Sequence, residues 1–353
     1  MTRFISLLIA LLLLLPAATL CAQRGDNLYN QVRQAAVEIL VDRHLAGSGC
    51  IVHADGMVLT AAHVIKNVKR EIEIVLSGTG RAAGTVVAVD AGHDLALLTL
   101  PNRRKPYPFL PLAKAFPAAG TTSFLYGTPF FRHDVMIPGV VARNDTTFEF
   151  VDGEYIEVIP LAAMVARGFS GGPWVNARGE VIGIQSSAIS LGDALQGIAF
   201  AAPLKHARQL LKSRESTTHV SLGAGVEEIG EQQPGFLETL PADASGLVVR
   251  VIHKGGAIDV AGITVDSIIS AIDKHPVERR DELLRALWRH QPGDTVELTV
   301  SAPDGTQKRT VSVRLQRLGP NYTASYPSTV FHEKGTGAYL DPRPRQNRRR
   351  NSN

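Results

Sequence analysis

The segment 168–173 (GFSGGP) contains a serine, Ser170, whose surroundings suit a nucleophile. A nucleophilic hydroxyl must be exposed, and the substrate backbone must approach it closely. Glycines on both sides leave that space and permit unusual backbone dihedral angles. The backbone N–H groups of Gly168 and Ser170 can then point at a developing oxyanion and form an oxyanion hole. The alternative interpretation is a glycine-rich turn without a catalytic role.

Two further residues have the chemistry to activate such a serine. His63 follows small residues in the segment 60–63 (TAAH), where a neutral imidazole can take the serine proton and return it to a leaving amine. Asp94 opens an apolar strand, where a carboxylate is costly to bury without a partner such as the second nitrogen of His63. Asp90 is the rival acid, but its neighbours (VDAG) are typical of a turn.

The order of these residues is stronger evidence than any one of them alone. His63, Asp94 and Ser170 follow one another at intervals of 31 and 76 residues. This is the order of chymotrypsin-fold enzymes, and it differs from the orders of subtilisin and the α/β-hydrolases. By contrast, His53, His93 and His133 do not have a metal-ligand spacing, and we expect no metal site.

The elements that must position these residues are mainly short β-strands. Short β-like runs broken by Gly, Asp and Pro predict an all-β barrel or sandwich, closed by a helix at 203–213. Apolar residues at helical spacing predict a short amphipathic helix over 26–39. The predicted strands are 46–53, 57–60, 71–76, 83–89, 94–99, 122–126, 138–142, 147–150, 155–159, 181–186 and 197–201.

A second region follows a polar linker at 214–219. Asp304-Gly305 between two β-like runs is a strong hairpin signal. The predicted strands are 222–227, 247–252, 266–272, 295–301 and 308–315, with a helix near 279–290. With 353 residues, 44% of them hydrophobic and 20% charged, the chain has the composition of a soluble protein with two ordinary domains.

The net charge of the chain lies in its C-terminal tail. Residues 319–353 carry six basic and two acidic side chains, which equals the +4 of the whole sequence. Net charge therefore gives no argument that the folded part binds nucleic acid, and we expect no nucleic-acid partner. The tail is rich in Pro, Asn, Ser and Arg, which favours disorder. Its arginines are solvated charge or, alternatively, a weak contact with an anionic surface.

The N-terminus has the pattern of an export signal. Arg3 precedes the apolar run 4–15, which is too short for a membrane span, and cleavage is expected after Ala22. A lipoprotein attached through Cys21 and an uncleaved anchor are the alternatives. If residues 1–22 are removed, Cys50 has no partner for an intrachain disulfide, and we expect it to be a small buried residue.

These motifs resemble the HtrA/Deg family of trypsin-like serine proteases. The resemblance runs from about 45 to 318 and implies a mainly β fold, a chymotrypsin-like double six-stranded β-barrel followed by an α+β PDZ domain. It also implies cleavage of unfolded or misfolded proteins without ATP, metal or another cofactor, and assembly as a homotrimer. The matching segments are 47–49 (GSG), 55–56 (DG), 59–64 (LTAAHV), 94–98 (DLALL), 170–173 (SGGP) and 197–201 (GIAFA).

The sequence departs from the family pattern around the nucleophile. Phe169 stands where the family usually has asparagine, so the loop geometry or its regulation could differ. Met164 lies six residues before Ser170, where enzymes that cut after Lys or Arg carry an acid. Without a carboxylate, a basic side chain would lose solvation in a pocket at Met164 and Val165. We therefore expect small or medium aliphatic residues before the cut.

The second domain, 220–318, resembles a bacterial PDZ domain. Leu222, Gly223 and Ala224 lie where the family binds a peptide C-terminus, which adds to the sheet as a strand. The alternative is a rigid interaction module that binds no free C-terminus. The expected boundaries are a signal peptide at 1–22, a trypsin-like protease domain at 23–215, the PDZ domain at 220–318 and a basic tail at 319–353.

Together these features predict a periplasmic or secreted serine endopeptidase that acts in protein quality control or regulated proteolysis. The alternative is a catalytically inactive or weakly active PDZ-dependent binding or chaperone protein, for which Phe169 is the best support. A third possibility is a protease that cuts a single partner after its PDZ domain has sensed a C-terminus.

Overall fold

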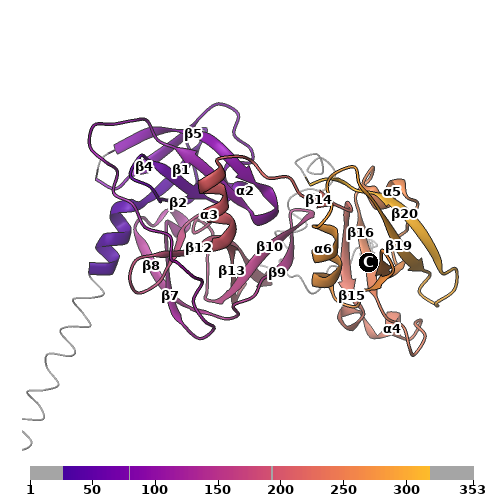
Figure 1. Cartoon of the computed structure of the whole chain (residues 1–353). Coiled ribbons are helices and arrows are strands. Elements are labelled where there is room, and N and C mark those ends of the chain that lie inside the picture. Colours follow the sequence, from indigo (N-terminus) through magenta and orange to yellow (C-terminus); the bar gives the residue numbers. More distant parts are fainter. Residues whose placement is uncertain (1–26, 79, 192–193, 319–353) are drawn as a thin grey trace, which may run out of the picture. The chain divides into compact units, whose positions relative to one another are not determined.

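The computed structural model describes residues 27–78, 80–191 and 194–318 (Figure 1). The predicted signal peptide (1–22) and basic tail (319–353) lie outside these residues. Within the described ranges, no helix has both the length and the hydropathy needed to cross a bilayer.

The chain forms two compact units, which are not contiguous in sequence. Among the described residues, the first contains those up to Thr146 together with Val158–Ala188 and Gly197–Thr217. The second contains the described residues from Thr218 onward, together with Thr147–Glu157 and the described part of Ile189–Gln196. Residues 147–157 therefore belong to the second unit, although in sequence they lie between two segments of the first unit.

Six strands of the first unit close into a barrel. They are hydrogen-bonded in the order β1-β2-β3-β6-β5-β4, and β1 closes the barrel by pairing with both β2 and β4. Alternate apolar side chains such as Ile39, Ile51 and Leu98 point inward and are fully buried. The strands are β1 (Ala36–Val41), β2 (His44–Ile51), β3 (Met57–Thr60), β4 (Ile72–Leu76), β5 (Gly80–Asp90) and β6 (Leu95–Thr99).

The predicted helix over 26–39 is too long. Only 27–35 are helical, and the chain then continues as β1. Val37 and Ile39 are β-branched and buried, and β1 has hydrogen-bonded neighbours on both sides, so pairing outweighs the helical spacing of the apolar residues. Asp42 and Arg43 have positive φ and make the short connection to β2.

The second β-rich region forms another closed arrangement. Its strands follow the order β13-β12-β11-β7-β8-β10-β9, and pairing of β13 with β10 closes six of the seven. Trp174 is fully buried there, and its Nε1 donates to Gln185 Oε1 at 2.8 Å. The elements are β7 (Thr122–Gly127), η2 (Pro129–Phe131), β8 (Val135–Val141), β9 (Thr147–Val151), β10 (Glu154–Ala162), β11 (Pro173–Val175), β12 (Val181–Leu191), β13 (Ala194–Pro203) and α3 (Leu204–Ser213).

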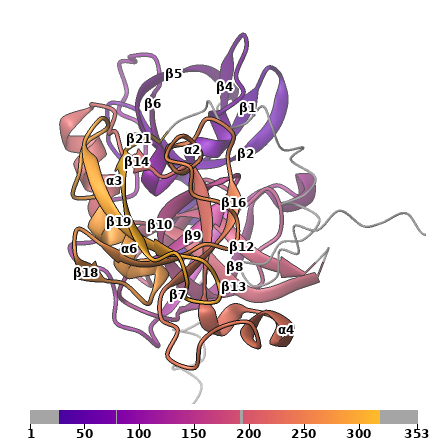
Figure 2. The same cartoon turned by 90° about the vertical axis from the view of Figure 1, so that its right-hand side faces the viewer.

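The second unit is built on a five-stranded antiparallel path, β15-β16-β17-β19-β20, with β15 at one edge. Figure 1 labels β15, β16, β19 and β20 of this path, and Figure 2 shows β16 and β19 with α6 from another direction. The predicted hairpin is confirmed, since Gly305 has positive φ between β19 and β20. The elements are β14 (Val220–Ser221), β15 (Ala224–Glu228), η3 (Ile229–Glu231), α4 (Pro234–Leu237), β16 (Leu247–Ile252), α5 (Ala257–Val260), β17 (Ile268–Ile272), β18 (His275–Pro276), α6 (Arg280–Leu287), β19 (Thr295–Ser301), β20 (Arg309–Arg314) and β21 (Gln316–Arg317).

The predicted fold class, two β-barrels followed by a smaller α+β domain, is therefore confirmed.

Candidate active site

Ser170 lies in the loop that joins β10 to β11, and the glycines around it are required by the backbone. Gly168 has φ +100°, and a Cβ there would lie 2.3 Å from the carbonyl oxygen of Thr128. Gly171 has φ +81°, and its Cβ would lie 2.2 Å from the carbonyl oxygen of Ser48. No other residue type fits these positions without displacing backbone.

Neighbouring strands hold this loop on two sides. The backbone N–H of Ser48 on β2 donates to the Ser170 carbonyl at 2.8 Å, and Gly171 N–H donates to the Gln185 carbonyl on β12 at 2.7 Å. The hydroxyl of Ser48, which is 2% exposed, also donates to the Gly168 carbonyl at 2.8 Å. The backbone on both sides of the serine is thus fixed by the first barrel and by β12.

The two predicted oxyanion donors have free N–H groups. Among the described residues, neither the Gly168 N–H nor the Ser170 N–H donates a hydrogen bond. The carbonyl of Arg167 accepts from the Phe130 N–H at 3.0 Å. Since C=O and N–H point in opposite directions across a trans peptide, this bond turns the Gly168 N–H away from Phe130. Both N–H groups remain available to a negatively charged ligand atom.

The structure brings His63 and Asp94 together. His63 lies on α2 (Ala62–Ile65), directly after β3, and Asp94 follows the one-turn helix η1 (Ala91–His93) with φ +51°. The ring Nδ1 of His63 is 2.8 Å from Asp94 Oδ2, and the His63 backbone N–H donates to Asp94 Oδ1 at 2.9 Å. One carboxylate therefore orients both the ring and the backbone of the histidine.

Asp94 is kept ionised although it is 6% exposed. Burial by itself would raise the pKa of Asp94, but the charge of His63 and hydrogen bonds from His63 and Ser186 outweigh it. The pKa of Asp94 is consequently below its usual value. The Ser186 hydroxyl donates to Asp94 Oδ2 at 2.5 Å. The site thus holds a buried anion against the imidazole of His63.

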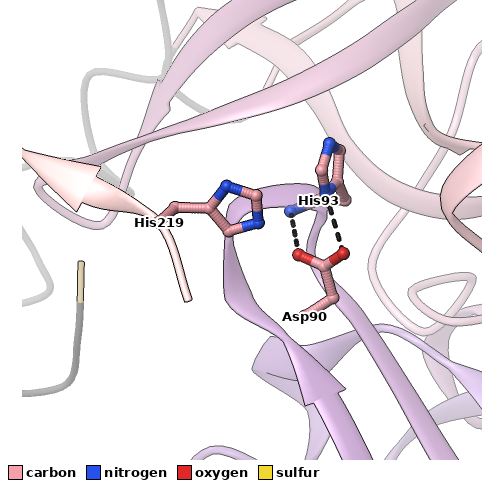
Figure 3. A group of neighbouring side chains, drawn as sticks. All are labelled: Asp90, His93 and His219. Carbon is pink, nitrogen blue, oxygen red and sulfur yellow. Dashed lines mark hydrogen bonds and ion pairs between the residues drawn. The ribbon is translucent and has the colours of Figure 1, made fainter. Parts of the chain in front are cut away.

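Asp90, the rival acid, binds a different histidine. Figure 3 shows its carboxylate turned toward His93, with Oδ2 2.8 Å from His93 Nδ1 and Oδ1 accepting from the His93 N–H at 3.2 Å. Asp90 thereby caps η1, the turn that leads into Asp94. Its carboxylate is used in supporting this turn, whereas Asp94 contacts His63.

The residues predicted around the nucleophile lie in different environments. Met164 is 62% exposed, and its Sδ is 4.0 Å from where a Cβ on Gly197 would be. Val165 is 5% exposed and packs in the core beside Trp174. Phe169 is 2% exposed and packs in that same core, so its ring does not lie over the serine.

Of the predicted peptide-binding residues of the second unit, Leu222 and Gly223 form the bend before β15, and Ala224 begins that strand. Gly223 has φ +65°, and Leu222 and Ala224 are buried. The Gly223 N–H donates to the Ser221 hydroxyl at 2.9 Å.

The sequence predicts no role for Ser186 or for Ser48, although Ser48 lies in the segment 47–49 that resembles the family. Ser186 contacts an acid 92 positions away, and the Ser48 hydroxyl contacts a loop 120 positions away. Serine is common in strands and loops, so only the three-dimensional fold distinguishes these two.

Comparison with known proteins agrees with this architecture. Residues 47–184 match the trypsin-like peptidase domain family, and residues 220–317 match the PDZ domain family. A curated relative from Ectopseudomonas mendocina, named "Probable periplasmic serine endoprotease DegP-like", is 30% identical over 270 residues, covering 74% of this chain and 55% of the relative. The chain belongs to the HtrA family. A protein of the same name from Rhizobium meliloti is 29% identical to this HtrA chain, covering 72% of it and 50% of the relative.

The HtrA chain spans about half the length of the curated relatives it matches. A solved structure described as the HtrA-type protease AlgW with a decapeptide superimposes with a TM-score of 0.59 at 22% identity, covering 84% of this chain and 99% of that one. At this identity the similarity shows a shared fold of both domains.

Proposed function

We propose that this HtrA-family protein is an exported serine endopeptidase that cleaves unfolded or damaged proteins with His63, Asp94 and Ser170 as its catalytic triad. The observation that carries the proposal is the 2.8 Å contact between His63 Nδ1 and buried Asp94, beside a nucleophile loop whose glycines allow no side chain. Nδ1 is thereby occupied, which leaves Nε2 of His63 to exchange protons with the serine.

The reaction follows from these positions. Ser170 Oγ attacks the scissile carbonyl carbon and gives its proton to His63 Nε2, while the N–H groups of Gly168 and Ser170 stabilise the oxyanion. When the resulting tetrahedral intermediate collapses, the C–N bond breaks and His63 gives the proton to the leaving amine. Water then attacks the acyl-enzyme, loses a proton to His63 and releases the carboxylic acid, and the proton returns to Ser170 Oγ.

We assign recognition of the substrate residue that precedes the scissile bond to the region around Met164. An exposed thioether without a carboxylate favours small or medium aliphatic side chains over Lys or Arg. Val165, the other residue assigned to this pocket, is buried in the core. The PDZ domain supplies a second binding site, for peptide C-termini, at residues 222–224. The periplasmic names of the relatives support export. The resemblance to the HtrA family supports assembly as a homotrimer.

The alternative function, an inactive PDZ-dependent binding or chaperone protein, rests mainly on Phe169. The ring of Phe169 packs in the core and does not block the nucleophile, so this residue gives the alternative little support.

The test is cleavage of reduced casein by residues 23–353 and by the same protein carrying Ser170→Ala. We expect fragments only from the unsubstituted protein, with aliphatic residues before the cuts. If neither protein cleaves casein or any peptide, with or without added C-terminal peptides, the enzymatic proposal is wrong.

A further inference from the structure

The edge strand of the PDZ sheet is the place where a peptide would bind. β15 pairs only with β16 in the described sheet path, and α6 packs beside it. A peptide that binds a PDZ domain adds to such an edge as a new strand and places its side chains against the helix. Such a peptide would form hydrogen bonds with the N–H and C=O groups of β15 that point away from β16. Without a bound peptide, these groups need other hydrogen-bond partners.

Tyr155 already uses these backbone groups. Its hydroxyl donates to the Val226 carbonyl at 2.9 Å and accepts from the Val226 N–H at 2.8 Å. Tyr155 is 7% exposed, and burial raises its pKa to about 12, so the phenol keeps its proton and remains a donor. One side chain thus satisfies both groups that an added strand would pair with at Val226.

Phenylalanines of the same hairpin fill the space beside β15 and α6. Phe148 is 1% exposed and packs edge-on against Trp288, with ring centroids 4.9 Å apart. Its backbone N–H donates to Asp281 Oδ1 in the first turn of α6 at 3.2 Å. The Phe150 ring lies over Gly225, where a Cβ would be 3.1 Å from it. Aromatic rings thus occupy the places where ligand side chains would pack.

A carboxylate from the hairpin reaches the predicted carboxylate-binding bend. Glu154 Oε2 accepts from the Ser221 hydroxyl at 2.8 Å, and that hydroxyl accepts from the Gly223 N–H. The Gly153 carbonyl lies 2.8 Å from His253 Nε2, which fixes the turn before Glu154. The hairpin therefore offers an acid, a strand-edge partner and apolar rings, the three features of a C-terminal peptide.

We infer that residues 147–157 are an internal ligand of the PDZ groove, and that a free C-terminus binds there only when this hairpin leaves. An intrachain segment competes at the effective concentration of a tethered ligand, typically millimolar. The apparent affinity for added peptide is reduced by the fraction of molecules whose groove is empty. This inference rests on the proposed peptide-binding role of the PDZ domain and not on catalysis.

The test uses residues 23–353 with Ser170→Ala, so that binding is measured without cleavage. Fluorescent decapeptides with a free C-terminal carboxylate on an aliphatic or aromatic residue are titrated by anisotropy, and the same peptides as C-terminal amides serve as the ligand control. The variants are Tyr155→Phe, which removes the phenol, and Glu154→Gln, which removes the charge. Tyr107→Phe is the matched control, since it removes a buried phenol that donates to the Pro101 carbonyl in the first unit.

Removing the hydrogen bonds of Tyr155 weakens the internal contact by about tenfold. We expect the Kd for carboxylate peptides to fall by about this factor in Tyr155→Phe and further in the double variant, with no change in Tyr107→Phe. Equal or weaker binding by folded Tyr155→Phe and double-variant proteins overturns the inference. So does the absence of binding by every variant.

Hydrogen exchange provides a second readout that needs no substitution. Saturating carboxylate peptide should raise the exchange of backbone amides in 147–157, while the amides of β19 stay protected. Peptide binding that leaves the exchange of 147–157 unchanged contradicts displacement of the hairpin.

Discussion

The two surfaces proposed to bind a peptide backbone differ in whether their hydrogen-bonding groups are already used. Beside Ser170, the N–H groups of Gly168 and Ser170 donate to nothing among the described residues. At the edge of β15, both backbone groups of Val226 are bonded to Tyr155. The first surface is ready for a ligand, whereas the second must lose an internal partner first. The difference shows that a recognisable binding motif does not by itself provide an open binding site.

The largest effect expected from a single change is at Asp94. Asp94→Asn should lower kcat/KM for a casein-derived peptide by about 10⁴-fold at neutral pH, because the amide cannot hold the required tautomer of His63. Asp90→Asn is the matched control, since it alters the neighbouring Asp–His pair. We expect a loss of tenfold or less from it. Equal losses in the two variants would contradict the assignment of Asp94.

The next largest effect concerns the glycine before the nucleophile. Gly168→Ala places a Cβ 2.3 Å from the Thr128 carbonyl and displaces the loop, so kcat should fall by about 10²-fold. Gly120→Ala is the control, because that glycine also has positive φ (+85°) but nothing lies within 4 Å of its Cβ. Steady-state kinetics of both variants, together with their melting temperatures, test the prediction. A normal kcat in Gly168→Ala would show that the free N–H of Gly168 is not used.

A smaller effect is expected at Ser186, whose hydroxyl donates to Asp94 Oδ2, the same oxygen that contacts His63 Nδ1. Ser186→Ala should lower kcat by about tenfold, since one of the hydrogen bonds that hold the Asp94 anion is lost. The pH–rate profile should change with it, because a less stabilised carboxylate has a higher pKa. An unaltered profile would mean that Ser186 has only a packing role. Ser213→Ala, at the exposed end of α3, is the control and should change neither quantity.

The smallest expected effect is a pH dependence of stability that arises from Glu149 in the hairpin 147–157. Burial raises the pKa of Glu149 to about 7, and Asp281 and Glu231 add to the shift while Arg280 opposes it. Since the folded state holds this proton more tightly than the unfolded state, the stability of the second unit should fall as pH rises from about 5 to about 8.

Glu149→Gln should remove this pH dependence and stabilise the second unit by about 1–2 kcal/mol at pH 8. Native-state hydrogen exchange of the buried β16 amides between pH 5 and pH 8 measures it. Glu238→Gln, at an exposed position, is the control. If the stability of Glu149→Gln still fell between pH 5 and pH 8, another titrating group would be responsible for the pH dependence.

The two surfaces also differ in how far sequence can predict them. His63, Asp94 and Ser170 stand out because each lies in a short segment with its own backbone requirement, and the fold class follows from strand patterns. The helix expected over 26–39 is cut short because β1 pairs on both sides, which local spacing does not reveal. Tyr155 and Val226 are 71 positions apart, and Ser186 and Asp94 are 92 apart. Such contacts depend on tertiary packing, and tyrosine, valine and serine occur at many other positions of the chain, so the sequence does not single these residues out.

The most direct test of the account is labelling of residues 23–353 with a fluorophosphonate probe in the absence of any peptide, followed by mass spectrometry of the labelled segment. If the site at Ser170 is assembled while the PDZ groove is occupied by its own hairpin, the probe should label Ser170 stoichiometrically, and His63→Ala should abolish labelling. No labelling of Ser170 without peptide, or labelling that survives His63→Ala, would contradict the assembled triad.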